Sequence, residues 1–129
     1  MKKKTLKLLA VLLVICLAVT ALAVFADSAS CTLTKSQYYA KSGYAIGNYA
    51  TGTLETKSDS TYSVVAKIYG DGAGYVSRTL TVAPGHRDNT TGPAASGFSA
   101  WYIYLQPVGS STGLGGHAWG EVITTLTAR

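Results

Sequence analysis

The sequence predicts an all-β protein: a small antiparallel β-sandwich or partly open barrel of roughly five to seven strands, preceded by a helical signal peptide. Three observations support this class. After residue 26 no stretch has a helical hydrophobic period of useful length. The apolar segments alternate with Thr, Ser and Tyr, which favour strands. Turn signals built from Gly, Pro, Asp and Ser separate these segments.

The first 26 residues have the layout of a secretory signal peptide. A lysine-rich start precedes Leu8 to Ala26, a run of 19 residues without a charge, and small or branched residues precede a cut before Asp27. The short basic start is typical of a bacterial leader. An apolar run of this length also suffices to span a bilayer, so an uncleaved membrane anchor is the alternative. Residues 27–129 are then a single secreted β domain, free outside the cell or retained at its surface.

The basic character of the chain comes mainly from this leader. The chain has 11 Lys and Arg against 6 Asp and Glu, but four of the lysines and none of the acidic residues precede residue 27. The remaining 7 basic and 6 acidic residues give the secreted part a net charge of +1. The basic residues are scattered rather than clustered, so we expect no nucleic-acid partner.

The first candidate strands are of unequal clarity. Cys31 to Thr34 alternates and predicts a first strand, which 36–40 either extends or follows as an edge piece. A second strand is expected over 44–56, with a bulge or bend at its glycines and with Tyr44, Ile46, Ala50 and Leu54 on one face. The clearest pair is 62–69 and 75–83, joined by a glycine-rich hairpin loop. Arg78 interrupts the inward face of the latter, which places it near an edge.

The stretch Phe98 to Gln106 is expected to be the central strand. Trp101, Ile103 and Leu105 alternate with Tyr102 and Tyr104, so both faces are apolar or aromatic and both require cover. Long connections over 84–97 and 107–116 flank it. The last strand, 117–127, places Trp119 on its outward face and is expected to pair with the central strand. Pairing is predicted to be mostly sequential.

A single cysteine, Cys31, remains after the leader, so no internal disulfide forms after cleavage. Three interpretations stay open: a buried small hydrophobic residue, a thiol that is free or paired between chains, and a lipidated N-terminal cysteine. The residues before Cys31 match a lipidation signal poorly, because Ser28 stands where an aliphatic residue is usual.

No spacing in the sequence indicates catalysis, so we expect a protein that is not an enzyme and needs no cofactor or metal. His86 could be oriented by Asp88 near Ser96 or Ser99, but no nucleophile signature surrounds these residues. The acidic residues on candidate strands, Glu55 and Glu121, face outward. His117 and Glu121 share a strand face but stand roughly 13 Å apart by the strand rise, too far to bind one ion.

Aromatic side chains remain as the candidate binding residues. Flat rings with polar tips stack on sugar rings and on partner proteins, although the same rings could simply shield a core. We expect them to form a stripe on one sheet face, with loop residues beside it. The candidate residues are Trp119, Tyr102, Tyr104, Tyr49, Tyr69, His86 and Arg87.

The sequence therefore favours an exported bacterial binding module that recognises a cell-wall glycan or a surface protein. The alternative is a secreted antimicrobial or toxin-like β protein that acts on the envelope of other cells; a strongly basic surface would favour it, and the net charge of +1 counts against it. A structural role in the envelope is a third possibility. Oligomeric state and strand order do not follow from these patterns.

Overall fold

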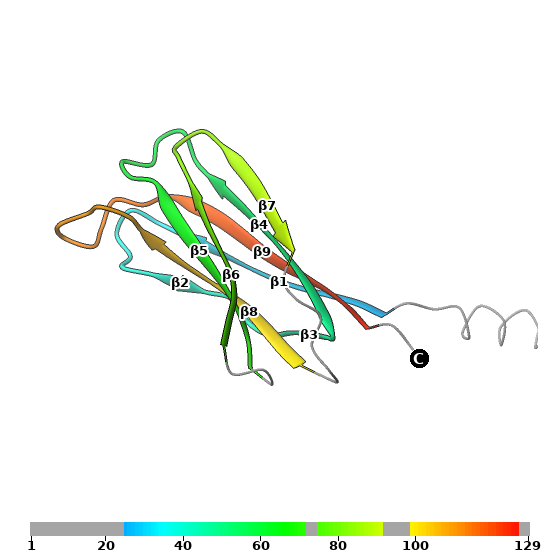
Figure 1. Cartoon of the computed structure of the whole chain (residues 1–129). Coiled ribbons are helices and arrows are strands. Elements are labelled where there is room, and N and C mark those ends of the chain that lie inside the picture. The colour runs from blue at the N-terminus through cyan, green and yellow to red at the C-terminus, as the bar shows by residue number, and fades with distance from the viewer. Residues whose placement is uncertain (1–24, 72–74, 92–98, 127–129) are drawn as a thin grey trace, which may run out of the picture.

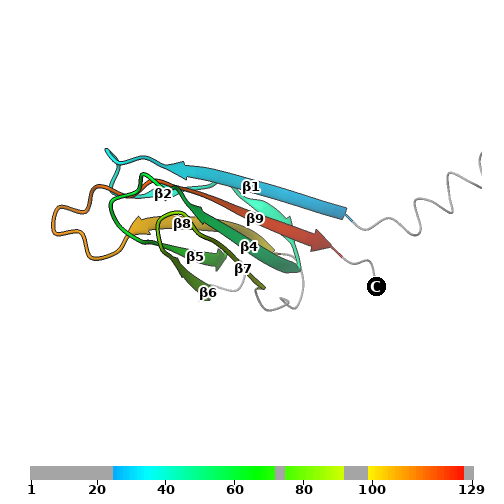
Figure 2. The same ribbon diagram turned by 90° about the horizontal axis from the view of Figure 1, so that it is seen from above.

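The computed structural model describes residues 25–71, 75–91 and 99–126, which form a sandwich of two antiparallel sheets (Figure 1; Figure 2). The predicted all-β sandwich is thus confirmed. The first sheet contains, in spatial order, β1 (Phe25–Leu33), β9 (Ala118–Leu126), β4 (Tyr49–Thr56) and β7 (Arg87–Thr91). The second contains β2 (Ala40–Lys41), β8 (Ser99–Pro107), β5 (Val64–Gly70) and β6 (Tyr75–Val82), and β3 (Ala45–Gly47) also pairs with β8.

The strand connections are those of a jelly roll. The short strands β2 and β3 lie along the same side of β8, one opposite Leu105 and the other opposite Trp101, so each sheet has four strand positions. Most connections pass from one sheet to the other. Among the described strands, only β5 and β6 are both adjacent in sequence and hydrogen-bonded to each other. The prediction of mostly sequential pairing is therefore wrong.

β8 is central within its sheet, as predicted, but two parts of the prediction are wrong: its partner, and the cover expected on both faces, since Tyr102 and Tyr104 lie on the outer face of the sandwich. β8 lies between β5 and the short strands β2 and β3, whereas β9 belongs to the opposite sheet. The two strands contact each other through their inner faces: a Cβ on Gly120 of β9 would lie 2.9 Å from a methyl group of Leu105. Two strands with one strongly apolar face bury more surface by packing face to face than by sharing a sheet.

The core fills the space between the sheets. Its largest fully buried side chains are Trp101, Leu33, Leu54, Ile68, Ile103, Leu105, Val64 and Val122. The alternation predicted for β5, β8 and β9 holds, because the inward side chains of these strands are buried and the alternate ones are partly or fully exposed. The edge position predicted from Arg78 also holds, since β6 ends the second sheet.

The strand predicted over 44–56 is divided at Asn48 between the two sheets. Gly47 ends β3, where a Cβ would lie 2.7 Å from the carbonyl oxygen of Thr125, so this crossing requires glycine. The division reverses the predicted face before it: Ile46 is exposed and Ala45 is buried. After the division, Ala50 and Leu54 are buried as predicted.

The connection over 84–97 contains a strand that the sequence pattern did not reveal. β7 pairs with β4 from Thr51 opposite Thr91 to Glu55 opposite Arg87. Its sequence, Arg-Asp-Asn-Thr-Thr, has no apolar residue. The strand therefore forms through backbone hydrogen bonds to the edge of β4, and not through the burial of apolar side chains. The connection after β8 is irregular as expected.

The leader falls largely outside the described residues. β1 nevertheless begins at Phe25, and its first two residues pair with Leu126 and Thr125, so the cleavage point expected before Asp27 lies within a strand. No helix among the described residues is long and apolar enough to cross a membrane.

Candidate functional site

Among the side chains that the structure describes, five tyrosines gather on the outer face of the second sheet, and we call this group with Lys41 the tyrosine surface. Tyr102 and Tyr104 come from β8 and Tyr69 from β5, where strand alternation turns them away from the core. Tyr39 and Tyr44 come from the irregular residues on either side of β2. These two are the most exposed members, at 55% and 50%.

The rings contact one another in two groups. Tyr39 stacks on Tyr104, with centroids 5.2 Å apart and planes at 16°. Tyr69 stacks on its cross-strand partner Tyr102 at 5.0 Å, and Tyr44 meets Tyr102 edge-on at 5.7 Å. Lys41 places its Nζ atom 4.3 Å from the centroid of the Tyr102 ring, within cation–π range. These contacts restrict the rotamers of the rings within each group.

The phenol of Tyr104 responds electrostatically to this crowding. Partial burial raises its pKa above the ordinary value of 10.0, and the neighbouring Tyr39 and Tyr69 add to the effect. The Tyr104 hydroxyl therefore stays protonated and able to donate a hydrogen bond throughout the physiological pH range.

The predicted single aromatic stripe is wrong, because the structure divides its members between two faces. Tyr69, Tyr102 and Tyr104 share the tyrosine surface. Trp119 lies on the outer face of the first sheet, on β9, and Tyr49 lies on β4 of the same sheet, 39% exposed. The pattern could not distinguish these faces, since alternation shows that a side chain points outward but not from which sheet. Tyr39 and Lys41 were missed because they lie in or beside an irregular segment. Tyr44 was missed because the predicted strand over 44–56 placed it on the same face as Ala50 and Leu54, whereas it is exposed.

The loop residues predicted with the stripe line a shallow groove at one end of the first sheet. The groove has a volume of about 540 Å³ and includes both histidines of the chain. We call it the histidine groove. Its lining residues are Glu55, Thr56, Lys57, Ser58, Asp59, Gly85, His86, Arg87 and His117.

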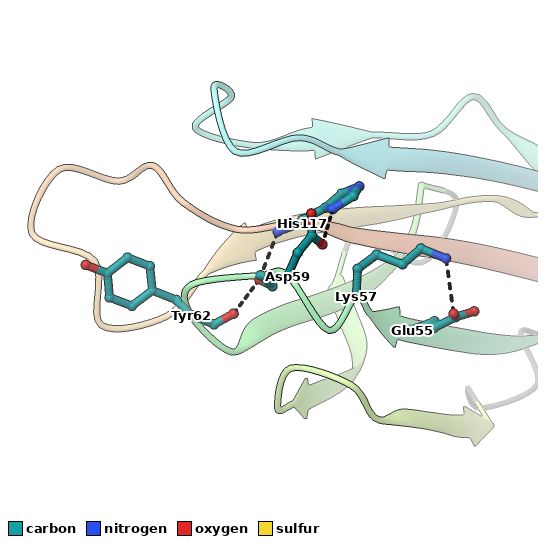
Figure 3. A network of polar contacts seen from close by, with 6 residues as sticks. Glu55, Lys57, Asp59, Tyr62 and His117 are labelled. Atoms are coloured by element: carbon teal, nitrogen blue, oxygen red, sulfur yellow. Dashed lines mark hydrogen bonds and ion pairs between the residues drawn. The ribbon is translucent and has the colours of Figure 1, made fainter.

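Ion pairs organise the walls of the histidine groove (Figure 3). On one wall, Glu55 accepts a hydrogen bond from Lys57 at 3.1 Å, and its second oxygen lies 4.0 Å from the Arg87 guanidinium. On the other, Asp59 contacts Nδ1 of His117 at 2.6 Å. Backbone bonds support this wall: the His117 N–H donates to the Ser60 hydroxyl, which in turn donates to the carbonyl of Tyr62.

Trp119 stands beside the groove and connects it to the outer face of the first sheet. It is the cross-strand neighbour of Glu55, which is in turn the neighbour of Arg87. The Arg87 guanidinium carbon lies 5.9 Å from the centroid of the Trp119 ring. The pattern indicated Trp119, His86 and Arg87 as candidates, and the structure brings these three together at one end of the molecule. Lys57, Asp59 and His117 join them only through tertiary contacts.

Of the residues considered for a catalytic arrangement around His86, Ser96 lies outside the described residues. Asp88 does not orient His86; its carboxylate accepts a hydrogen bond from the backbone of Asn89 at 2.8 Å. Ser60 donates to a backbone carbonyl rather than to a histidine. Among the described residues, no group of three or more His, Cys, Asp or Glu side chains is placed to hold a metal ion.

The contact between Asp59 and His117 makes a prediction for acid titration. The hydrogen bond with His117 lowers the pKa of Asp59 below its ordinary value of 3.8, and the charges of His117 and Lys35 act in the same direction. A lowered carboxyl pKa stabilises the fold above the pKa of the unfolded chain, and this contribution disappears as the pH falls through the folded value. In a carboxyl-carbon NMR titration we expect Asp59 to titrate below 3.8. The substitution His117→Gln is expected to raise its midpoint, and an unchanged midpoint would contradict the contact.

Comparison with solved structures finds sandwiches of similar outline at low sequence identity. A protein of the disulfide-linked pili described as Bacillus endospore appendages is 19% identical; 81% of this chain and 90% of that chain align, with a TM-score of 0.49. FlhE is 13% identical over 82% of this chain and 97% of its own, with a TM-score of 0.44. A family 6 carbohydrate-binding module is 9% identical over 82% and 94%, with a TM-score of 0.39. No protein-family model and no curated protein sequence matches the chain.

Proposed function

We propose that this protein is an exported, non-enzymatic binding module that holds a glycan on the tyrosine surface, outside the cell that makes it. The observation that carries the proposal is the array of five tyrosine rings and Lys41 on one outer sheet face, with Tyr39 and Tyr44 half exposed. Export rests on the leader predicted from the sequence.

The chemistry of the surface suits a sugar. The C–H faces of a pyranose pack against aromatic rings, and tyrosine hydroxyls and a lysine ammonium bond to sugar hydroxyls. The rings are already restricted by mutual stacking, so a ligand would order few side chains on binding. The rings alternate along β8 at two-residue intervals and continue onto neighbouring segments, which favours an extended chain over a single small molecule.

Cross-strand stacking of aromatic rings also stabilises sheets. The array therefore indicates a binding site only if some of its rings lie where they do not serve to stabilise the sheet. The pair of Tyr69 and Tyr102 fits the purely stabilising role. Tyr39 and Tyr44 do not, because both lie outside the strands and keep at least half of their surface in solvent. The half-exposed rings of Tyr39 and Tyr44, next to the ammonium group of Lys41, favour a role in binding a ligand.

The proposal is tested by binding to a glycan array and to insoluble cell-wall polysaccharide. For a glycan that binds, Tyr39→Ala and Tyr104→Ala should each weaken binding about tenfold, which corresponds to about 1.4 kcal/mol. Tyr49→Ala is the matched control, because Tyr49 is an exposed tyrosine on the opposite sheet, and its affinity should match that of the unaltered protein. Absence of any glycan ligand, or equal losses with all three variants, would contradict the proposal.

A further inference from the structure

The histidine groove is a second polar site, on a different sheet and with different chemistry from the tyrosine surface. Its size of about 540 Å³ is within the range of small-molecule sites. Its lining is polar and charged, and it contains the ion pair of Glu55 with Lys57 and the contact of Asp59 with His117. We propose that the histidine groove binds a uronic acid residue, with the sugar carboxylate on Arg87 and the sugar hydroxyls between the two walls.

The lining pairs two cations with two carboxylates, and the charges nearest Arg87 leave that guanidinium the one best placed to bind an anion. Glu55 is the carboxylate shared by two cations, Lys57 and Arg87, so the wall that these three residues form carries one positive charge in excess. Lys57 takes the close contact at 3.1 Å, while Arg87 remains at 4.0 Å, beyond hydrogen-bond distance. The Arg87 side chain is 59% exposed. Within the described residues its guanidinium therefore has N–H groups available for a bidentate bond to a carboxylate.

The opposite wall favours a hydroxyl-rich ligand over a simple anion. Asp59 uses one oxygen on His117 and is itself exposed, so its other oxygen can accept from a sugar hydroxyl. His86 and Ser58 are also exposed and supply groups that donate or accept. A ligand with a carboxylate at one end and hydroxyls along its ring satisfies both walls together.

Trp119 adds a reason to expect a ring. Its side chain is partly exposed and its indole lies 5.9 Å from the Arg87 guanidinium. A sugar whose carboxylate is bound by Arg87 would be placed next to this aromatic face. Acetate offers the carboxylate without the ring, and a neutral disaccharide offers the ring without the carboxylate, so the two compounds separate the contributions.

The test is a calorimetric titration of the protein, as its host produces it, with digalacturonate, the matching neutral digalactoside and acetate. The titration measures the affinity for each compound. Digalacturonate should bind at least tenfold more tightly than either comparison compound. Arg87→Ala should weaken it about tenfold and Arg87→Lys by less, because lysine keeps the charge but not the bidentate geometry. Glu55→Gln should strengthen it about threefold, a gain that a merely structural role for Glu55 would not produce.

Separate variants distinguish this site from the tyrosine surface. Tyr104→Ala should leave digalacturonate binding unchanged, and Trp119→Ala should weaken it. Equal binding of the neutral digalactoside, or digalacturonate binding that survives Arg87→Ala and disappears with Tyr104→Ala, would overturn the groove proposal while leaving the tyrosine surface standing. If no neutral glycan binds but digalacturonate still binds, the groove proposal stands and the proposal for the tyrosine surface fails.

Discussion

Replacing Trp101 by alanine is expected to remove about 3–5 kcal/mol from the free energy of unfolding, the range seen for large aromatic residues truncated in cores. The side chain is fully buried and is the largest in the core. Its indole N–H donates to the carbonyl oxygen of Gly47 at 3.1 Å, across the crossing between β3 and β4. The substitution therefore opens a cavity and leaves a buried carbonyl without its donor.

The surroundings of Trp101 leave little room to relax. A Cβ on Gly70 would lie 2.8 Å from the Trp101 ring, so the indole already packs directly on the backbone of β5. Since domains are stable by only about 5–15 kcal/mol, the loss is a large share of the total. Equilibrium denaturation in urea measures it as a shift in midpoint.

The matched control is Trp119→Ala, which removes the other tryptophan from the outer face of the first sheet. Because Trp119 is partly exposed, we expect this variant to lose less than about 1 kcal/mol. Trp101→Phe should fall between the two, since it keeps most of the ring and loses the hydrogen bond to Gly47. Similar losses for the two alanine variants would contradict the assignment of Trp101 to the core.

The thiol of Cys31 is expected to react about 100-fold more slowly in the folded protein than in the unfolded chain at pH 8. Burial raises its pKa from 9.0 to about 11, and the thiolate that reacts becomes scarcer by the same factor. The side chain packs against the core, and its sulfur lies 3.9 Å from the carbonyl oxygen of Ile103. Of the three interpretations, the small hydrophobic residue agrees best with this placement.

The measurement is the rate of modification by an aromatic disulfide reagent, with and without denaturant. Peptide mass analysis separates Cys31 from Cys16 wherever the leader remains. Cys31→Ser is the control for background reaction. Equal rates in the folded and unfolded protein would show that the thiol is exposed and free to pair between chains.

Several features of the fold could be predicted from local patterns alone. Strands β5, β6, β8 and β9 have alternating side chains, and alternation directly determines which side chains point to the core. The central position of β8 followed from its apolar content. β7 could not be found this way, because its polar residues contribute backbone bonds rather than buried surface. The division of 44–56 was equally invisible, since Gly47 is compatible with a bulge as well as with a crossing between sheets.

The candidate sites could likewise be predicted only in part. The patterns indicated Tyr69, Tyr102 and Tyr104 as outward aromatics, and they do lie together. The patterns also placed Trp119 and Tyr49 with them. These two residues lie on the other sheet of the sandwich, so they face the opposite side of the molecule. The contact between Asp59 and His117 joins residues 58 positions apart in sequence, and no local pattern encodes such a contact.

The sequence by itself determined the all-β class, the inward faces of β5, β8 and β9, and the outward placement of Tyr69, Tyr102, Tyr104 and Trp119, because each depends on a residue and its near neighbours. The tertiary structure alone decided which strands pair, which sheet carries each ring, and that the two histidines line one groove. These outcomes depend on how two apolar sheet faces bury each other, a free-energy balance over the whole core that no single segment contains.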